Sequence, residues 1–259
     1  MSIRFIKVIS IFVIAGVFFV LLSKCVYADK KINAAVVAGF MKPFREIAAA
    51  FEKETGIKIN VAFTSAGRLY GQIINGAPYD IFLSADQQRP DLLFGKALCS
   101  KPFIYAIGEV VLWSSNREFC ASGDWREALK QNGTKKIAIA NPQTAVYGAS
   151  AQRALKDTGL WNDIEPRLVT TEDLALVFQY ATLGAVDAGF CALAHAYSEE
   201  GREGCYCEMK DAPVVIHAAC VLKKARNPEL ADRFGAFLIS PTAEKIKKKY
   251  GYKHTTGER

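Results

Sequence analysis

The stretch Asn75-Gly-Ala-Pro-Tyr-Asp-Ile-Phe-Leu-Ser-Ala-Asp86 predicts a helix end, a turn, a short buried strand and a second turn. Gly76 is expected to end the helix because glycine adopts the left-handed conformation that closes one, and Pro78 keeps the helix from resuming. Residues 81–83 form an apolar run typical of a strand inside a parallel sheet. Residues 84–86 then follow the carboxyl end of that strand, where open α/β folds place ligands. By itself, the stretch fits any α/β protein.

Residues 1–28 are predicted to be a secretion signal that is removed from the mature protein. Arg4 and Lys7 make a basic start, residues 8–22 are almost entirely apolar, and Ala28 supplies a small residue at the cut. The apolar run is short for a membrane span and a polar globular sequence follows it. We therefore expect export to the periplasm.

A lipoprotein signal with attachment at Cys25 is the alternative, and it fits less well because Lys24 stands where such signals carry a small residue. Removal of the signal takes away three basic residues and no acidic one, so the formal net charge falls from +7 to +4. A charge this small and scattered gives no reason to expect a nucleic-acid partner. The basic run at 245–249 is expected to be the solvated face of a terminal helix.

The mature chain would keep six cysteines: Cys99, Cys120, Cys191, Cys205, Cys207 and Cys220. An even number in an exported chain suggests disulfides formed in an oxidising compartment. Cys99 and Cys120 flank a predicted strand pair and could be joined, and the other four could form two more bridges. Metal binding is the other interpretation, but the spacing of Cys205 and Cys207 does not match a zinc knuckle, and the histidines form no ligand pair.

The rest of the chain alternates predicted strands and helices, which indicates an α/β fold whose parallel sheets are covered on both faces. The spacing of Phe44, Ile47 and Phe51, for example, places them on one helix face. Strands are predicted at 31–38, 57–63, 81–83, 103–113, 136–140, 168–169, 188–192 and 214–222. Helices are predicted at 43–54, 67–74, 148–158, 173–182, 228–239 and 242–250.

Four segments that follow strands lead into helices, and helix starts suit anions because they carry unpaired N–H groups and partial positive charge. Small residues in these segments would let a ligand approach the backbone closely. In the last segment, Thr170 and Asp173 have capping-box spacing. The four segments are Ala38-Gly-Phe-Met41, Thr64-Ser-Ala-Gly67, Ala145-Val-Tyr-Gly148 and Thr170-Thr-Glu-Asp-Leu174.

A series of motifs spans almost the whole mature chain in order. They are Phe51-Glu-Lys-Glu-Thr-Gly56, Gly67-Arg-Leu-Tyr-Gly-Gln-Ile73, the run from Gly76 to Asp86, Phe103-Ile-Tyr-Ala-Ile-Gly-Glu-Val-Val-Leu-Trp-Ser114, Ala140-Asn-Pro142 with Tyr147-Gly148, and Ala188-Gly-Phe190. In these motifs the chain resembles the ModA-type molybdate-binding proteins, which are the exported subunits of ABC importers.

The resemblance implies a fold of two α/β lobes joined by two crossover strands, with molybdate or tungstate held in the cleft by helix N-terminal N–H groups. Lobe one would comprise residues 29–107 plus 217–259, and lobe two residues 108–216. Closure of the lobes on the anion would create the surface that an inner-membrane ABC permease reads. The resemblance further implies a monomer without a cofactor.

By the same resemblance, the ligand-binding positions are Gly39, Phe40, Ser65, Ala66, Tyr147 and Leu174. The chain departs from the family at two of them, because serine or asparagine is usual at Gly39 and a hydroxyl residue at Ala66. Only backbone N–H groups remain there. Tyr147 could donate through its N–H, its hydroxyl or both, and Leu174 through its N–H.

Ser65 and Arg68 are the candidates to replace the missing donors, and Arg68 could give a bidentate contact if it points into the cleft. Ala192 stands where another branch of the family has a pocket tyrosine. Each missing hydrogen bond to a charged ligand is worth about 1.5–3 kcal/mol, or roughly one to two decades of affinity.

The alternative is therefore the same scaffold with a roomier pocket that binds a larger anion, such as an organic phosphate or carboxylate. An enzyme on a related two-lobed fold is the third hypothesis, and it lacks an activated nucleophile or acid–base pair. Asp80 and Asp86 could pair, but capping and turn roles explain both.

Overall fold

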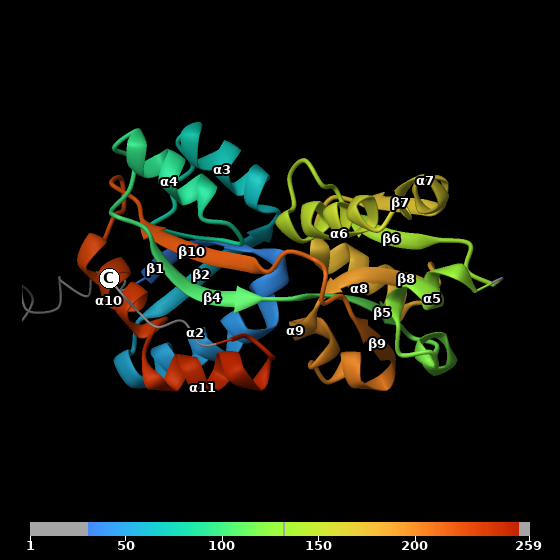
Figure 1. Ribbon diagram of the computed structural model, residues 1–259. Helices are drawn as coiled ribbons and strands as arrows, with labels where there is room; N and C mark the ends of the chain where they lie inside the picture. The colour runs from blue at the N-terminus through green and yellow to red at the C-terminus, as the bar shows by residue number, and fades with distance from the viewer. Residues whose placement is uncertain (1–30, 132, 254–259) are drawn as a thin grey trace, which may run out of the picture. The chain divides into compact units, whose positions relative to one another are not determined.

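The computed structural model describes residues 31–131 and 133–253. The predicted secretion signal and the alternative lipid site at Cys25 lie outside the described residues. Within them, the chain forms two five-stranded mixed sheets with helices packed against each (Figure 1). The two-lobed α/β fold predicted from the sequence is confirmed, but the sheets are mixed rather than parallel, because β10, β4, β5 and β9 pair antiparallel. We call the part built on the first sheet the first lobe and the part built on the second sheet the second lobe.

The first sheet has the strand order β2-β1-β3-β10-β4. Strand β1 is parallel to β2 and β3, whereas β10 is antiparallel to β3 and β4. The strands are β1 (Lys31–Val37), β2 (Lys58–Thr64), β3 (Ile81–Ser84), β4 (Phe103–Gly108) and β10 (Val215–Val221). Residues 81–83 are fully buried in the middle of this sheet, as their apolar run predicted.

The second sheet has the order β7-β6-β8-β5-β9. Strand β6 is parallel to β7 and β8, and β5 is antiparallel to β8 and β9. The strands are β5 (Val110–Ser114), β6 (Ile137–Ala140), β7 (Leu168–Thr171), β8 (Ala188–Ala192) and β9 (Cys205–Glu208). The chain passes into this sheet at Glu109 and leaves it between β9 and β10, so two short connections join the lobes.

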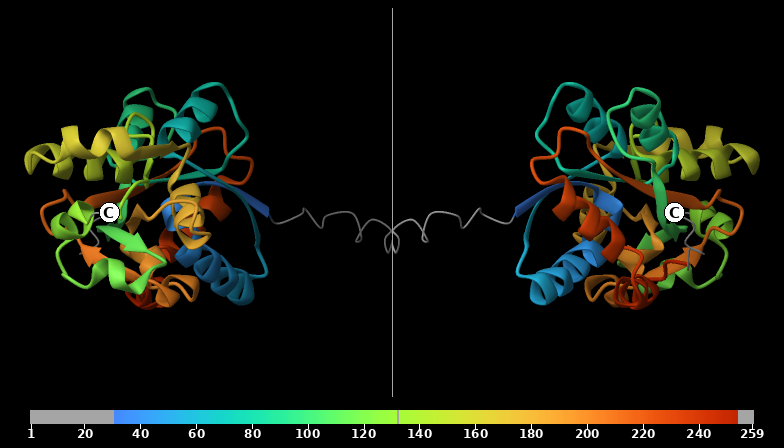
Figure 2. Two further views of the ribbon diagram at one scale, coloured as in Figure 1. Left: turned by 90° about the vertical axis from the view of Figure 1, so that its right-hand side faces the viewer. Right: turned by 90° about the vertical axis from the view of Figure 1, so that its left-hand side faces the viewer.

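Around the first sheet, α3 and α4 lie on one side and α2 and α11 on the other (Figure 1). Figure 2 shows α2 beside α11 in both side views, in agreement with their contacts. The helical elements of this lobe are η1 (Ala38–Phe40), α2 (Met41–Thr55), α3 (Ala66–Ile74), α4 (Gln88–Gly95), α10 (Pro228–Phe237) and α11 (Pro241–Lys249). Gly56 and Gly76 have φ of 69° and 86°, the left-handed conformation expected at the ends of α2 and α3.

In the second lobe, α6, α8 and α9 contact the sheet. The elements are η2 (Arg117–Cys120), α5 (Trp125–Lys130), α6 (Val146–Asp157), α7 (Trp161–Ile164), η3 (Glu165–Arg167), α8 (Leu174–Thr182), α9 (Leu193–Ala196) and η4 (Glu200–Glu203). None of the helices in the described ranges is long and apolar enough to cross a membrane.

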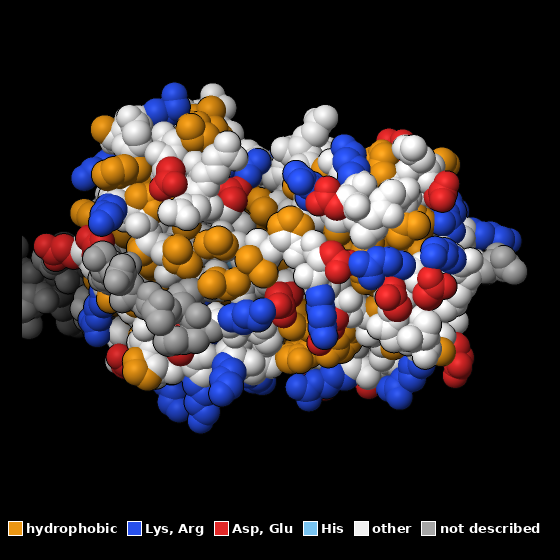
Figure 3. Space-filling model, viewed as in Figure 1, with side chains coloured by type: hydrophobic (Ala, Val, Ile, Leu, Met, Phe, Trp, Pro, Cys, Tyr) orange, Lys and Arg blue, Asp and Glu red, His pale blue; other side chains and the backbone are white. Residues whose placement is uncertain are grey.

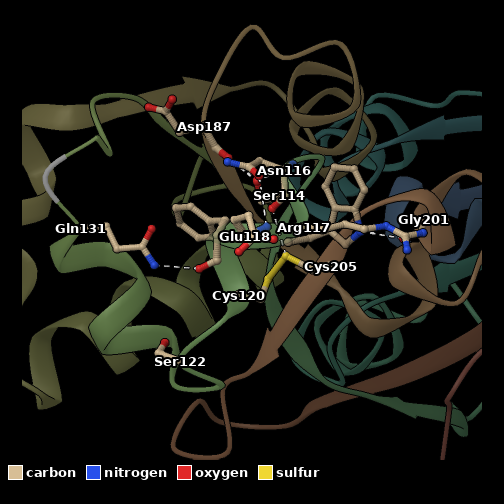
Figure 4. Close-up of a disulfide and its surroundings, with 12 residues drawn as sticks. Ser114, Asn116, Arg117, Glu118, Cys120, Ser122, Gln131, Asp187, Gly201 and Cys205 are labelled. Atoms are coloured by element: carbon tan, nitrogen blue, oxygen red, sulfur yellow. Dashed lines mark hydrogen bonds between the residues drawn. A yellow bond between two sulfur atoms is a disulfide. The ribbon is translucent and has the colours of Figure 1, made fainter.

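The sequence prediction of a staple between Cys99 and Cys120 is wrong. Cys120 is bonded to Cys205, and the bond ties η2 to β9 within the second lobe (Figure 4). Cys99 pairs with Leu222 in the first lobe, so the two lobes separate it from Cys120.

The two further bridges are also absent among the described residues, where the remaining cysteines, Cys99, Cys191, Cys207 and Cys220, are free and buried. Cys191 and Cys207 flank β5 and pair with its adjacent residues Val111 and Leu112. Adjacent strand residues point to opposite faces of the sheet, so these two thiols face away from each other. No group of three or more His, Cys, Asp or Glu side chains that could hold a metal occurs in the described ranges.

The basic run on α11 is only partly a solvated face. Lys245, Lys248 and Lys249 are exposed, in line with the basic side chains along the lower edge of Figure 3. Lys247, however, is buried and donates hydrogen bonds to the Tyr105 carbonyl and to Glu244. Burial lowers the pKa of Lys247, while Glu244 opposes that shift. The helix therefore uses one of its lysines to anchor itself to the first sheet.

Candidate functional site

The four helix starts singled out in the sequence converge between the lobes. A side chain on Gly39 would meet Leu174 Cδ2 at 2.8 Å and Tyr147 Cε2 at 3.2 Å, so η1 lies against the starts of α6 and α8. The Gly67 N–H, at the start of α3, donates to the Thr144 carbonyl just before α6 at 2.9 Å. Segments far apart in the sequence thus present four helix N-termini to one region.

Three of these helix starts lack a side-chain cap among the residues that the structure describes: η1, α3 and α6. Their first N–H groups are therefore not consumed by an acidic or hydroxyl side chain, which is the condition an anion needs at a helix N-terminus.

The fourth start, that of α8, is capped differently from the sequence prediction. The cap is Asp173, whose Oδ1 accepts hydrogen bonds from the N–H groups of Ala175 at 3.0 Å and Leu176 at 3.2 Å. The predicted capping box beginning at Thr170 is wrong, because Thr170 still belongs to strand β7. Leu174 itself is buried, and its N–H is not among the groups that Asp173 binds.

The buried hydroxyl groups of Ser65 and Thr64 are the clearest indication of a ligand-binding site. Ser65 is 4% exposed, and neither its hydroxyl oxygen nor that of Thr64 has a hydrogen-bond partner within the described ranges. Unpartnered buried hydroxyls are costly and uncommon in folded proteins. Both lie at the end of β2 where α3 begins, so this site has polar side chains ready to bind something.

Arg68 does not lie free in the site. Its guanidinium is paired with Glu172, and both side chains are about half exposed. Because Arg68 belongs to α3 and Glu172 precedes α8, the pair links the two lobes at the rim. A second such pair joins Lys42 of α2 to Glu200 of η4 at 2.6 Å. These ion pairs stabilise contact between the lobes but are exposed, so each contributes little by itself.

The extra room expected above Gly39 is absent. Leu174 and Tyr147 already occupy the space that a side chain would fill, so a serine or asparagine could not be accommodated without movement. The side chains of Leu174 and Tyr147 therefore fill the volume that a side chain at residue 39 would take. The Gly39 carbonyl accepts a hydrogen bond from the Tyr252 hydroxyl at 3.0 Å, which helps to fix η1.

The Tyr147 hydroxyl meets a residue that the sequence analysis did not single out. It lies 3.0 Å from Nε2 of His217, a fully buried residue of β10. Burial, and secondarily Lys247, lowers the pKa of His217 to about 3, so its imidazole is neutral at pH 7. No sequence pattern pointed to His217, because the histidines are dispersed and the tertiary fold alone brings this one to Tyr147.

One surface cavity, of about 470 Å³, lies elsewhere in the second lobe and is lined in part by Trp125, Arg126 and Asp211. Its Arg126 is already paired with Asp124 and Asp211. Because these carboxylates neutralise Arg126, the cavity is a poorer candidate for an anion site than the four helix starts.

The chain is similar in sequence to a family of solute-binding proteins and to molybdate-binding proteins. Residues 32–253 match the family described as bacterial extracellular solute-binding protein. The chain is 34% identical over 227 residues to the molybdate-binding protein ModA of Rhodobacter capsulatus, covering 87% of this chain and 89% of that protein. It is also 34% identical over 233 residues to ModA of Azotobacter vinelandii, covering 88% and 92%.

The fold agrees with these sequence matches. The solved structure of the Azotobacter vinelandii periplasmic molybdate-binding protein matches with a TM-score of 0.82 and 29% identity, covering 87% of this chain and 100% of that one. The similar proteins are solute-binding components of transport rather than enzymes, as the sequence analysis predicted for this chain.

Proposed function

Since this chain belongs to the family of bacterial extracellular solute-binding proteins, we propose that it captures molybdate between its two lobes and delivers it to an ABC permease. Tungstate is a tetrahedral dianion with the same hydrogen-bonding demands, so we expect it to bind as well. The protein would act in the periplasm, after removal of residues 1–28, as a monomer.

The observation that carries this proposal is the meeting of four helix N-termini, one of which begins beside two buried, unpartnered hydroxyls. The donors would be the backbone N–H groups of Gly39, Phe40, Ala66, Tyr147 and Leu174, together with the hydroxyl of Ser65. Helix N-termini stabilise an anion without a countercharge, and dipoles held in place by the fold need little reorganisation on binding. Arg68 is left out of this donor set because Glu172 engages it.

The alternative of a larger organic anion loses part of its support. It depended on room left by the side chains missing at Gly39 and Ala66, and above Gly39 Leu174 and Tyr147 occupy that room.

A thermal-shift comparison tests the ligand class. The mature protein is heated with molybdate, tungstate, sulfate, phosphate or glycerol 3-phosphate in turn. Molybdate and tungstate should raise the melting temperature, because a ligand at about 100 times its Kd stabilises the native state by about 2.7 kcal/mol. A rise with glycerol 3-phosphate and with neither metal oxyanion would reject molybdate as the ligand.

Substitution of Ser65 tests the site. Ser65→Ala removes one hydrogen bond to a charged ligand, so we expect molybdate affinity to fall about 10- to 100-fold in calorimetric titration. Ser240→Ala is the matched control, since Ser240 also precedes a helix but its hydroxyl already accepts a hydrogen bond from the Ala243 N–H. The control should lose stability but not affinity, and equal affinity losses in both variants would exclude Ser65 from the site.

A further inference from the structure

A buried polar cluster lies behind the proposed anion site, at the connection between the lobes. His217 is on β10 where its pairing with β4 shifts register, an irregularity that re-aims a side chain. Its ring is surrounded by Phe40, Tyr105, Tyr147 and Tyr252, with ring centroids 5.4–5.8 Å away. Among these, Tyr147 belongs to the second lobe, whereas His217 belongs to the first.

The hydrogen bonds of this cluster define where its protons lie. The Tyr105 hydroxyl is 3.2 Å from the Ser84 carbonyl oxygen and 3.1 Å from His217 Nδ1. A carbonyl only accepts, so the Tyr105 proton is donated to Ser84 and Tyr105 accepts from Nδ1–H. A neutral imidazole protonated at Nδ1 has a bare Nε2, which must accept. The Tyr252 hydroxyl, whose own proton goes to the Gly39 carbonyl, is the other acceptor beside Tyr147. An imidazole nitrogen is a stronger acceptor than a phenol oxygen, so the Tyr147 hydroxyl, 3.0 Å from Nε2, donates its single proton to His217.

This assignment decides what Tyr147 offers to the anion. A tyrosine hydroxyl has one proton, and once His217 accepts it none is left to donate to a negative ligand. Desolvation by burial raises the pKa of Tyr147 well above its usual value, so the hydroxyl keeps its proton at neutral pH. The main-chain N–H of Tyr147 is unaffected by this bond and stays available.

We propose that His217 is a positioning residue that withdraws the Tyr147 hydroxyl from the anion and uses it to fasten the two lobes together. The proposal rests on the proposed function and deepens it. The donors to the anion from α6 are then main-chain N–H groups only. The bond between Tyr147 and His217 forms only when the second lobe contacts the first, so it favours the closed arrangement.

The first test is direct observation of the imidazole by nitrogen NMR on the ¹⁵N-labelled protein. We expect His217 to carry its proton on Nδ1 and to show a hydrogen-bonded, unprotonated Nε2, both without ligand and after addition of molybdate. A proton on Nε2, or loss of the Nε2 hydrogen bond when molybdate is added, would overturn the proposal, since Tyr147 would then be free to donate to the anion.

The second test is a double-mutant cycle with Tyr147→Phe, His217→Leu and the pair, read in molybdate affinity and in unfolding by urea. Each single variant should lower affinity about 3- to 10-fold, and the double variant should be no weaker than the single ones, because all three lose the same bond. His217→Gln retains an acceptor near Nε2 and should restore most of the affinity. Additive losses, or a loss of more than about 10-fold in Tyr147→Phe alone, would show that the hydroxyl serves the anion instead.

The control is Tyr79→Phe, which removes a hydroxyl that donates to Gln72 at 2.8 Å on the exposed surface of the first lobe. It should leave affinity unchanged. Failure of the proposed function is seen separately, as the absence of a thermal shift with any oxyanion. In that case the tautomer of His217 and the coupling measured in urea still decide whether the two residues act together.

Discussion

At the scale of single residues, two buried histidines determine how this protein should respond to acid. His217 has a pKa lowered to about 3, and His195 has a pKa lowered to about 4 by burial and then by Lys42. His195 stacks on Phe178 with ring centroids 4.8 Å apart, and its Nδ1 has no partner within the described ranges. Both rings are folded into the protein in the neutral form.

We predict that stability falls as the pH drops below about 6.5. An unfolded histidine binds a proton near pH 6.5 while the folded one does not, so the unfolded state gains protons between 6.5 and the folded pKa of about 3–4. Stability is therefore complete above pH 6.5 and is lost progressively below it, by up to about 1.4 kcal/mol per pH unit for each histidine. Urea unfolding at pH 7, 6, 5 and 4.5 measures this slope.

His217→Gln separates the histidine effect from that of the carboxylates, which also destabilise proteins in acid. The variant should show a slope reduced by about one proton relative to the unchanged chain. Identical slopes in the two proteins would mean that His217 takes up its proton as readily when folded as when unfolded.

The sequence pointed to some of the candidate site residues and not to others. The segment around Ser65 could be singled out because it follows a strand and precedes a helix, and the family resemblance then named Ser65 within it. His217 could not, because its importance comes from a register shift in β10 and from Tyr147, which approaches it from the other lobe. Arg68 fitted the charge of an anion, but its partner Glu172 could not be known before the lobes were placed together.

At the scale of elements, the disulfide between Cys120 and Cys205 joins a short 3₁₀ helix to the edge strand of the second sheet. The bridge closes a long loop, since the two cysteines are 85 residues apart in sequence. A cross-link of this kind stabilises chiefly by restricting the unfolded chain.

We predict that replacing both bonded cysteines by serine lowers the free energy of unfolding by about 2–4 kcal/mol in urea titration. The denatured, unreduced protein should react with a thiol reagent at Cys99, Cys191, Cys207 and Cys220, which are the free cysteines of the described chain. Labelling at Cys120 in that sample, or unchanged stability of the double variant, would argue against the bridge.

Most element positions followed from local patterns, and the misses have physical causes. The extended segment predicted at 103–113 is two strands, β4 and β5, because the chain changes sheets at Glu109 while remaining extended. Strand β9 escaped notice since its sequence, Cys-Tyr-Cys-Glu, is short and lies at a sheet edge. The disulfide pairing depended on which lobe each cysteine joins, which spacing alone could not settle.

At the scale of the whole molecule, the lobes meet through a backbone contact at Gly67. A Cβ at this position would lie 3.1 Å from Thr144 Cα and 3.2 Å from the Thr144 carbonyl oxygen, across the boundary between the lobes. Backbone atoms cannot swing aside as a flexible side chain can. Any side chain at Gly67 is therefore expected to hinder the approach of the two lobes.

We predict that Gly67→Ala weakens molybdate binding by about 10-fold while leaving the unfolding free energy without ligand nearly unchanged or slightly raised. The affinity should fall because closure supplies part of the binding energy, whereas alanine is a better helix former than glycine. Gly71→Ala is the matched control, since it lies in the same helix with no atom within 4 Å of the added carbon. Calorimetry that finds the two variants equal in affinity would mean that the lobes need not approach at Gly67.

The order of strands in the first sheet has a consequence for folding during the export proposed above. Strand β10 separates β3 from β4, yet it follows the entire second lobe in sequence. A polypeptide emerging from a translocation channel with its N-terminus first presents β4 long before the strand that must pair with it. The half-built sheet then exposes hydrogen-bonding edges that attract other chains, so we expect the nascent protein to depend on a holding chaperone until β10 arrives.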